Sequence, residues 1–506
     1  MKTPKTVGVI GAGTMGRGIV QWLAQAGHAV LCFDAMEGAA QKGVAYVNDM
    51  MARAVEKGRM TAAAAAEVAA CMRACPNIEA LEACDLVIEA IVEDLAAKRA
   101  MFAMLEAVLR PDAILASNTS SLTVADIAAA CRHPERVAGL HFFNPVPLMK
   151  VVEIIAAVRT SPAVVEQLRA LVAATGHRAV VAQDQPGFLV NHAGRGLYTE
   201  GLRIVEDHVA TVEEVDTLLR EAAGFRMGPF ELLDLTGLDV SGKVMESIYA
   251  QFHQEPRFRP SALVPPRIAA GLLGRKTDEG WYRYRDGQKI VSAPRAVPVP
   301  EAGLAVWIDE EAADRAALSA IVGAAGATLA ADPSDDCLLV VQPWGHDVSS
   351  VCAARGLDPL RCVGVDPLPG LDRHRTLMLS AVTAPRWRDA ACAMLATDGV
   401  AVTVIGDSPG FVVQRVLAVI VNIAANIAQR RIASVQDLED AVRLGLGYPF
   451  GPLGWGDRLG ANRILEILHK LQAATGDPRY RPSPWLARRA ALGLSLLAPE
   501  AERHAA

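Results

Sequence analysis

The chain has 506 residues, too many for one compact core, so three or four domains are expected. Its net charge of −6 argues against a nucleic-acid-binding protein, although local phosphate sites remain compatible with it. The nine cysteines form no C-x-x-C pair and show no metal-ligand spacing, which favours reduced thiols in a cytosolic protein without a metal.

The N-terminal stretch MKTPKTVGVIGAG runs directly into a strand and a glycine turn, which leaves no room for a targeting segment. The longest apolar run, Val416–Ala425, is interrupted by Asn422 and is predicted to be a buried helix rather than a membrane span. We therefore expect a cytoplasmic protein with neither a membrane nor a nucleic acid as partner.

Short apolar runs alternate with helical patterns along the first part of the chain. The predicted strands are Thr6–Ile10, Ala29–Phe33, Asp85–Ile91 and Ala113–Ala116, and a helix is predicted over Arg17–Gln25. Such alternation predicts an α/β fold with a doubly wound, parallel sheet of the Rossmann type.

A glycine-rich turn follows the first predicted strand. Gly11-Ala-Gly13-Thr-Met-Gly16 is a G-x-G-x-x-G pattern, and Asp34 ends the second predicted strand 18 residues later. In this context the turn predicts a pyrophosphate on the N-terminus of the following helix, with Asp34 bonded to the adenosine ribose. The negative charge of Asp34 favours NAD over NADP. The alternative is a structural turn that binds no ligand.

The segment AGLHFFNPVP, Ala138–Pro147, places a histidine directly after a predicted strand. His141 among aromatic residues could be a core residue. However, doubly wound folds bind ligands at this point, Glu153 could reach the ring, and Ser120 and Asn144 supply polar groups nearby. A histidine paired with a carboxylate is suited to base catalysis.

Long helical patterns, including Leu197–His208 and Val212–Ala223, begin after Pro186 and indicate a second, helical domain. The proline-dense stretch Ser292–Gly303 then predicts a linker.

Beyond the linker the chain repeats itself. Asp184–Asn191, DQPGFLVN, recurs as Asp407–Gln414, DSPGFVVQ, at an offset of 223, and Gly228-Pro229 recurs as Gly451-Pro452 at the same offset. We therefore predict a degenerate second copy of both domains. The expected parts are residues 1–185 (NAD-binding Rossmann domain), 186–291 (helical substrate and dimerisation domain), 292–302 (linker), 303–405 (degenerate Rossmann-like domain) and 406–506 (second helical domain).

The second copy has no G-x-G-x-x-G, and its sequence alignment with the first copy predicts that it has no active site. Asp366-Pro-Leu-Pro369 aligns with Asn144-Pro-Val-Pro147 at an offset of 222. The alignment also pairs Val363 with His141, Arg375 or Thr376 with Glu153, and Gln414 with Asn191.

Three motifs, SNTSSL at Ser117–Leu122, GLHFFNPVPLMKVVE at Gly139–Glu153 and DQPGFLVN at Asp184–Asn191, resemble those of L-3-hydroxyacyl-CoA dehydrogenases. The resemblance covers about residues 5–290. The duplicated half is similar to that of longer bacterial members of the family, among them 3-hydroxyadipyl-CoA dehydrogenases of phenylacetate breakdown.

The resemblance implies a role for each matching residue. His141 would be the general base and Glu153 its orienting carboxylate, while Ser120 and Asn191 would bond the substrate oxygen and help to seat the nicotinamide. The remaining positions would line the NAD site (Glu93, Lys98, Asn144 and Lys276) or meet coenzyme A (Lys57, with Ser120).

Some of these positions allow other interpretations. Lys98 and Lys57 could be ordinary solvated helix charges, and Asn191 could be a helix cap. Met50 stands where some relatives carry a CoA-contacting serine, and His192 stands where arginine is common.

The expected reaction is the NAD-dependent oxidation of an L-3-hydroxyacyl-CoA to the 3-oxoacyl-CoA, in fatty-acid or aromatic catabolism. Substrates to consider are 3-hydroxyadipyl-CoA and 3-hydroxybutyryl-CoA, with Arg195 and Arg203 as cations for a carboxylate tail. The alternatives are a dehydrogenase of free β-hydroxyacids and a non-catalytic dinucleotide-binding protein. Either a homodimer or an internal pseudo-dimer through the helical domains is expected.

Overall fold

The computed structural model describes residues 4–291 and 296–501, so the first four residues of the predicted linker lie outside the described residues. The chain forms two compact units. The first unit comprises Met1–His192 with Arg430–Leu446, and the second comprises Ala193–Gln429 with Gly447–Ala506. The predicted division into five parts follows the sequence repeat, whereas each compact unit combines segments of both copies. The five-part division therefore stays a prediction.

The first unit is built on an eight-stranded sheet with the order β3-β2-β1-β4-β5-β6-β7-β8, in which only the β6–β7 pair is antiparallel. Its strands are β1 (Thr6–Ile10), β2 (Ala29–Phe33), β3 (Met72–Ala74), β4 (Leu86–Glu89), β5 (Ile114–Ser117), β6 (Val137–His141), β7 (Val151–Ala156) and β8 (Arg178–Gln183). The carboxyl ends of β1, β4, β5 and β6 therefore meet at one edge of the sheet.

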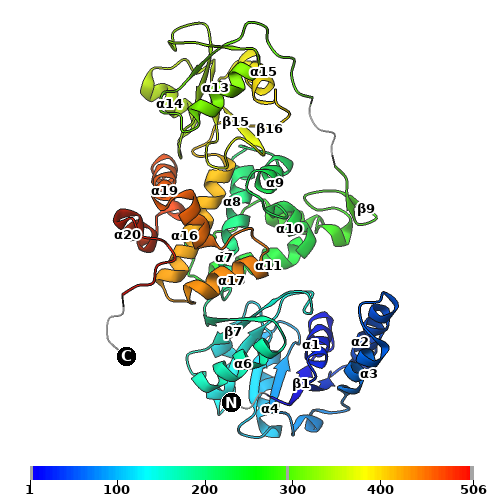
Figure 1. Ribbon diagram of the computed structural model, residues 1–506. Coiled ribbons are helices and arrows are strands. Elements are labelled where there is room, and N and C mark those ends of the chain that lie inside the picture. The colour runs from blue at the N-terminus through cyan, green and yellow to red at the C-terminus, as the bar shows by residue number, and fades with distance from the viewer. Residues whose placement is uncertain (1–3, 292–295, 502–506) are drawn as a thin grey trace. The chain divides into compact units, whose positions relative to one another are not determined.

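Helices cover both faces of this sheet, which explains why its strands are apolar on both sides. The core includes Val7, Val9, Ile88 and Leu140, all without exposed surface. The helices are α1 (Thr14–Gln25), α2 (Ala39–Glu56), α3 (Ala62–Ala70), α4 (Leu95–Val108), α5 (Val124–Ala128), α6 (Pro162–Ala174), α7 (Val190–Ala193) and α17 (Val435–Gly445), with the 3₁₀ turns η1 (Ile78–Leu81) and η2 (Pro134–Arg136). Helices α2 and α3 lie side by side next to α1 (Figure 1).

The second unit contains a smaller sheet with the order β12-β11-β13-β14-β15-β16, in which the β14–β15 pair is antiparallel. Its strands are β11 (Ala305–Ile308), β12 (Thr328–Leu329), β13 (Leu338–Val341), β14 (Cys362–Val365), β15 (Arg375–Leu379) and β16 (Val402–Ile405). Helices α13 (Arg315–Ala324), α14 (Val348–Arg355) and α15 (Pro385–Leu395) accompany this sheet. The sheet confirms the predicted second copy of the Rossmann pattern.

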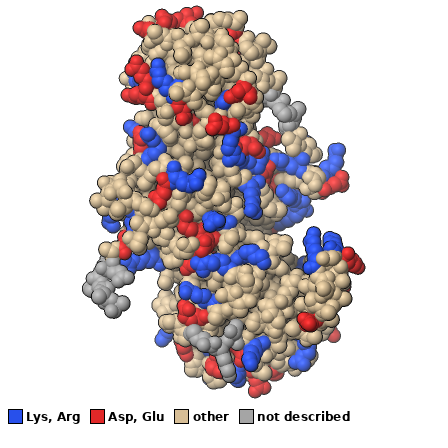
Figure 2. Space-filling model, in the orientation of Figure 1, with Lys and Arg blue, Asp and Glu red and all other residues tan. Residues whose placement is uncertain are grey.

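The other helices of the second unit form an all-α region. They are α8 (Arg195–Glu206), α9 (Val212–Glu221), α10 (Pro229–Thr236), α11 (Leu238–Gln251), α12 (Val264–Ala269), α16 (Val412–Gln429), α18 (Pro452–Leu459), α19 (Ala461–Thr475) and α20 (Pro484–Leu492). Short elements complete it: β9 (Tyr284–Arg285), β10 (Gln288–Lys289), η3 (Pro256–Phe258), η4 (Arg275–Thr277) and η5 (Pro478–Tyr480). Charged residues of both signs are interspersed over the visible faces of the two units (Figure 2).

Most predicted elements of the first copy are present, and the ends of some of them are shifted. Thr6–Ile10 and Ala29–Phe33 are strands with those bounds, whereas the first helix begins at Thr14, three residues before the predicted start. The helix begins directly after its N-cap Gly13, so the last three residues of the glycine pattern, up to Gly16, belong to its first turn.

Helix α16 is the predicted buried helix. By length and composition alone it could cross a membrane, but 89% of that stretch is buried inside the protein. It packs along α8 (Figure 1), where a Cβ atom on Gly196 would lie 3.3 Å from the backbone of Ile420. A buried helix in the protein core accounts for its apolar character.

The two copies exchange helices. In the first unit, α17 of the second copy packs on β7 and β8, where Arg178 pairs with Asp437 at 2.6 Å and with Asp440 at 2.8 Å. The Gln183 amide donates to the Ile432 carbonyl at 2.8 Å. In the second unit, α9 of the first copy lies against β16 in the equivalent arrangement.

The same backbone bond recurs there at the repeat offset, from the amide of Gly406 to the carbonyl of Val209 at 2.8 Å. Each copy therefore covers the last strand of the other copy's sheet.

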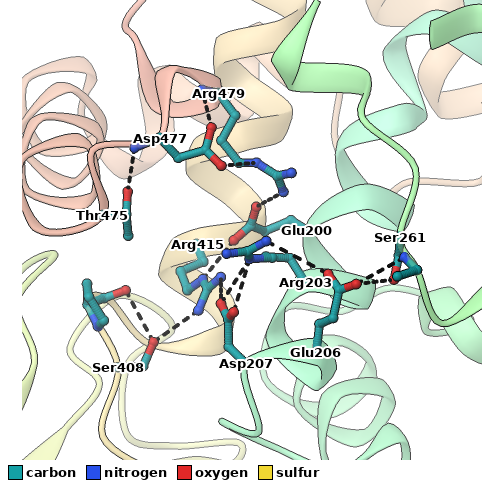
Figure 3. A network of polar contacts seen from close by, with 12 residues as sticks. Glu200, Arg203, Glu206, Asp207, Ser261, Ser408, Arg415, Thr475, Asp477 and Arg479 are labelled. Carbon is teal, nitrogen blue, oxygen red and sulfur yellow. Dashed lines mark hydrogen bonds and ion pairs between the residues drawn. The ribbon is translucent and has the colours of Figure 1, made fainter. Parts of the chain in front are cut away.

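A buried ionic network joins α16 to α8 (Figure 3). The Arg415 guanidinium lies 2.7 Å from Glu200 and 3.3 Å from Asp207, and the Tyr480 hydroxyl donates to Glu200 at 2.8 Å. Arg415 and Glu200 are almost without exposed surface, and such charges tolerate burial only when they are paired. Arg415 stands at the repeat position of His192.

Strand pairing corrects the sequence alignment of the second copy. Thr376 pairs with Thr403 as Glu153 pairs with Val180, which confirms Thr376 as the counterpart of Glu153. The amide of Asp366 donates to the carbonyl of Thr376 at 3.2 Å, directly beyond the β14–β15 register.

Asp366 therefore occupies the position of His141, which faces Glu153 in the β6–β7 register. The prediction that Val363 is this counterpart is wrong, because the loop between the two antiparallel strands is two residues shorter in the second copy and shifts the offset.

We expect a chain ending at Val291 to self-associate or aggregate, because it lacks α16 and α17. It would expose the apolar face of α8 that α16 covers and the side of β8 that α17 covers. Size-exclusion chromatography with light scattering, beside the intact chain, measures this. A monodisperse, folded monomer would contradict the exchange as a structural requirement.

Candidate active site

The glycine turn after β1 has a distinct steric reason for each glycine. Gly11 has a φ of +94°, and a Cβ atom there would lie 2.5 Å from the carbonyl oxygen of Ala90. A Cβ atom on Gly16 would lie 1.7 Å from the oxygen of Gly11. At Gly13, by contrast, a Cβ atom would meet nothing within 4 Å. Gly11 and Gly16 are thus required by packing, whereas Gly13 leaves an open face on the turn.

The residues around the turn fit an NAD molecule. No side chain of the described residues caps α1 at Gly13, so the positive helix end faces the open side of the turn. Asp34 at the end of β2 accepts hydrogen bonds from the amides of Ala12, at 2.7 Å, and Met36, at 2.9 Å. These bonds fix a carboxylate beside the turn, where it suits ribose hydroxyls and repels a 2′-phosphate.

His141 and Glu153 form a buried pair across the β6–β7 register. The Nδ1 atom of His141 lies 2.5 Å from Oε2 of Glu153, and the two residues are 4% and 0% exposed. A carboxylate at Nδ1 places the ring proton on that nitrogen and leaves Nε2 to accept a proton. His141 is therefore a buried histidine with a carboxylate partner, the pairing that is suited to base catalysis.

Glu153 is held from its other side by the start of α7. Its Oε1 atom accepts hydrogen bonds from the amides of Leu189, at 3.0 Å, and Val190, at 2.8 Å. Three donors thus compensate the burial of this carboxylate. Asn191 is the next residue of α7, so the DQPGFLVN motif positions both the carboxylate and the asparagine.

Two aromatic rings flank the imidazole. The Phe143 ring centroid lies 4.5 Å from that of His141 and the Phe188 centroid 5.7 Å from it. With these rings beside it, His141 is 4% exposed and its imidazole lies in a largely apolar environment.

The serine loop after β5 is organised by a single carboxylate. Glu93 Oε1 accepts bonds from the Thr119 hydroxyl, at 2.8 Å, and from the amides of Ser120 and Ser121, at 2.9 and 3.0 Å. Burial acts to raise the pKa of Glu93, but the charge of Lys98 and these hydrogen bonds together lower it below its usual value. Glu93 is therefore ionised and fixes the backbone around Ser120.

Lys98 is not a solvated helix charge. It is 1% exposed, and its ammonium lies 2.7 Å from Glu89 and 3.3 Å from Glu93. Sequence reasoning missed Glu89, the buried last residue of β4. The available signal was the one that identified His141, a polar residue at the carboxyl end of an apolar strand.

Two further predicted residues of the first unit lie on its surface. Asn144 is exposed in the loop after β6, next to a cis bond to Pro145, and Lys57 is exposed at the C-cap of α2. Met50 is half-buried and packs on the core, so it offers no polar group to coenzyme A.

Other predicted residues belong to the second unit. Lys276 pairs with Asp239. Arg203 on α8 pairs with Asp207 at 3.0 Å, so its charge is already balanced. Arg195 is buried on the same helix with its guanidinium 4.8 Å from the ring centroid of Tyr198.

A dinucleotide turn and a histidine–carboxylate pair at one edge of one sheet are features of nicotinamide-dependent dehydrogenases as a class. The family model for "3-hydroxyacyl-CoA dehydrogenase, NAD binding domain" matches residues 6–185. The model for the C-terminal domain of that family matches residues 187–284 and again residues 410–495. The chain belongs to the 3-hydroxyacyl-CoA dehydrogenase family and is an NAD-dependent oxidoreductase.

Individual relatives agree with this assignment. The chain is 38% identical to a 3-hydroxyadipyl-CoA dehydrogenase of Escherichia coli over 96% of its own length and 98% of that protein. It is 39% identical to a 3-hydroxybutyryl-CoA dehydrogenase of Bradyrhizobium diazoefficiens, over 56% of this chain and 97% of the other. A crystal structure of a 3-hydroxybutyryl-CoA dehydrogenase from Escherichia coli K12 matches with a TM-score of 0.85 and 36% identity, over 97% of this chain and 99% of that one.

The corresponding position in the second copy carries a different cluster. Asp366, fully buried, accepts a bond from Gln414 Nε2 at 2.9 Å through Oδ1, while its Oδ2 has no hydrogen-bond partner among the described residues. Thr376 faces it in place of Glu153, and Gln414 also holds the amide of Gly345 at 2.9 Å. Here the repeat position of Asn191 serves internal packing.

Asp366→Asn should stabilise the protein at alkaline pH. Burial raises the pKa of Asp366 from 3.8 to about 7, so the folded chain keeps a proton that the unfolded chain releases between these values. The parent's free energy of unfolding therefore falls as the pH rises through this window, by about 1.4 kcal/mol per unit. Asparagine keeps the accepting oxygen and carries no charge.

The urea midpoint of the variant should exceed that of the parent at pH 8. The difference between the two midpoints should become smaller towards pH 5. A difference between variant and parent that is the same at both pH values would contradict the burial of a titrating carboxyl group.

Proposed function

We propose that His141 is the general base of this dehydrogenase and that Glu153 is its orienting carboxylate. The 2.5 Å contact between Nδ1 and Oε2 supports this proposal most directly, because it reserves Nε2 as the proton acceptor. The glycine turn and Asp34 would hold NAD, which would supply the hydride acceptor for C3 of the substrate. The imidazole takes the proton of the hydroxyl group, and Glu153 stabilises the imidazolium that forms.

We infer supporting roles for the polar residues at the same sheet edge. Ser120, on a loop fixed by Glu93, would bond the substrate oxygen together with Asn191, which follows the two amides that hold Glu153. Asn144 and Lys276 would contact NAD, and Lys57, exposed at the end of α2, would meet the phosphates of coenzyme A.

We propose a short 3-hydroxyacyl-CoA as the substrate, and 3-hydroxyadipyl-CoA in the first place. One relative that aligns over 96% of this chain is named for 3-hydroxyadipyl-CoA, and a solved structure that covers 97% of this chain is titled for 3-hydroxybutyryl-CoA, so both names support a short acyl chain. This substrate would place the enzyme in the catabolism of aromatic or fatty acids, in the cytoplasm.

We further propose that the second copy takes the place of a partner subunit. The reciprocal backbone bonds of Gln183 and Gly406, and the burial of Glu200 against Arg415, support an internal pseudo-dimer. An isologous dimer of single copies would make each of these contacts twice.

His141→Ala should lower kcat by at least about a hundredfold and leave the affinity for NADH within about twofold, because the base handles a proton and does not hold the cofactor. NADH absorbance with 3-oxobutyryl-CoA measures turnover, and NADH fluorescence measures binding. His133→Ala, at an exposed histidine paired with Glu135, is the matched control and should change neither quantity. Full turnover by His141→Ala would refute the base assignment.

A panel of 3-hydroxybutyryl-, 3-hydroxyhexanoyl- and 3-hydroxyadipyl-CoA, with the corresponding free acids, tests the substrate class. We expect kcat/KM to be highest for the adipyl ester and negligible for every free acid. Preference for the hexanoyl ester over the adipyl ester would contradict the dicarboxylyl proposal. Oxidation of the free acids would favour a free-acid dehydrogenase, and inertness towards all esters would favour a non-catalytic protein.

A further inference from the structure

Glu89 is a buried carboxylate that neither the sequence motifs nor the proposed reaction uses. It ends β4, the strand between β1, which leads into the glycine turn, and β5, which leads into the serine loop. The side chain has no exposed surface. A charge at this depth is stable only with compensating partners, and the partners of Glu89 all belong to the same sheet edge.

The contacts of Glu89 reach both the loop and a lysine. Oε2 accepts a bond from the Ser117 hydroxyl at 2.7 Å, and Oε1 accepts from the Ile91 amide and from the Lys98 ammonium, each at 2.7 Å. Ser117 is the last residue of β5, so the bond of its hydroxyl holds the start of the serine loop to β4.

Lys98 links Glu89 to Glu93 by an ion pair with each of them. Its buried ammonium lies between the two carboxylates, 2.7 Å from one and 3.3 Å from the other. Glu93 in turn accepts bonds from the backbone and hydroxyl groups of Thr119, Ser120 and Ser121. The charges alternate in sign along the series, so loss of the first carboxylate would leave Lys98 to pair with Glu93 alone. Glu93 would then be drawn from the loop towards Lys98.

The second copy indicates that a sheet of this kind forms without the charged residues Glu89, Lys98 and Glu93. Asp407 accepts a hydrogen bond from the amide of Val348 at the start of α14, as Asp184 accepts one from the amide of Val124 at the start of α5. Helix α14 therefore corresponds to α5, and the strand before it, β13, corresponds to β5. The chain passes from β12 directly to β13, and β11 pairs with β13. Within residues 296–501 there is accordingly no counterpart of β4 or α4. The copy that lacks the glycine turn and the histidine also lacks this strand and helix.

We propose that Glu89 is a positioning residue of the dehydrogenase, which acts through Lys98 and Glu93 to fix Ser120 on the sheet edge that carries His141. The inference rests on the proposed role of Ser120 at the substrate oxygen. A displacement of the serine by a fraction of an ångström is sufficient to misalign the substrate, because reaction rates depend steeply on such geometry.

The test compares Glu89→Gln, Ser120→Ala and the double variant in the full-length protein, with kcat and KM for 3-oxobutyryl-CoA and NADH. Glu89→Gln should lower kcat/KM for 3-oxobutyryl-CoA at least about tenfold. In the double variant kcat/KM should stay within about twofold of its value in Ser120→Ala alone. Once the Ser120 hydroxyl is gone, Glu89 no longer has a contact to position. A merely structural role would give additive losses.

Glu106→Gln is the matched control. Glu106 lies on α4 like Lys98, is almost fully buried, and caps the amides of Arg132 and His133 at 2.6 and 2.8 Å, next to Arg136 at the opposite edge of the sheet. It should lower the unfolding temperature and leave kcat/KM unchanged. Ser117→Ala loosens Glu89 without removing its charge, and it should reproduce the same coupling to Ser120→Ala with a smaller loss.

The outcomes separate the two claims. If Ser120→Ala is fully active, the proposed role of Ser120 fails. If Ser120→Ala is impaired but its loss adds to that of Glu89→Gln or Ser117→Ala, that role stands and the positioning role of Glu89 is refuted.

Discussion

The architecture of the site depends on the burial of one carboxylate. Glu153 has no exposed surface and would be unstable as a charge, yet His141 and the amides of Leu189 and Val190 satisfy both of its oxygens. The pair requires the antiparallel β6–β7 register, and the amides require the chain to turn into α7 directly after the sheet. Sheet, turn and helix thus converge on an imidazole with one defined tautomer, which is the property that base catalysis requires.

The duplicated half shows what the scaffold retains when this constraint is absent. Asp366 and Thr376 occupy the positions of His141 and Glu153, and Gln414 folds its amide onto Asp366 and Gly345 instead of facing a ligand. The exchanged helices and the contact between α8 and α16 remain. The second copy thus carries the surfaces that pack on the first copy, and the side chains at the positions of His141 and Glu153 are buried in its own core.

The strands, the glycine turn and the His141–Glu153 pair could be predicted because each leaves a local pattern in the sequence: apolar runs, glycine spacing and a polar residue at a strand end. The counterpart of His141 in the second copy could not, since a two-residue shortening of one loop shifts the alignment, and only strand pairing fixes the register. Glu89 was missed and Lys98 left open because burial and ion pairing depend on tertiary contacts. The exchange of α9 and α17 has no local signature at all.

The most direct test of the central claim is Glu153→Gln. A glutamine has one accepting oxygen, which the amides of Leu189 and Val190 would retain, so its NH₂ group would donate to His141 Nδ1 and move the ring proton to Nε2. We expect kcat to fall by about a thousandfold or more, as expected for a base in the wrong tautomer, with NADH affinity unchanged. A variant with the parent's kcat would show that the carboxylate does not prepare His141 for proton transfer.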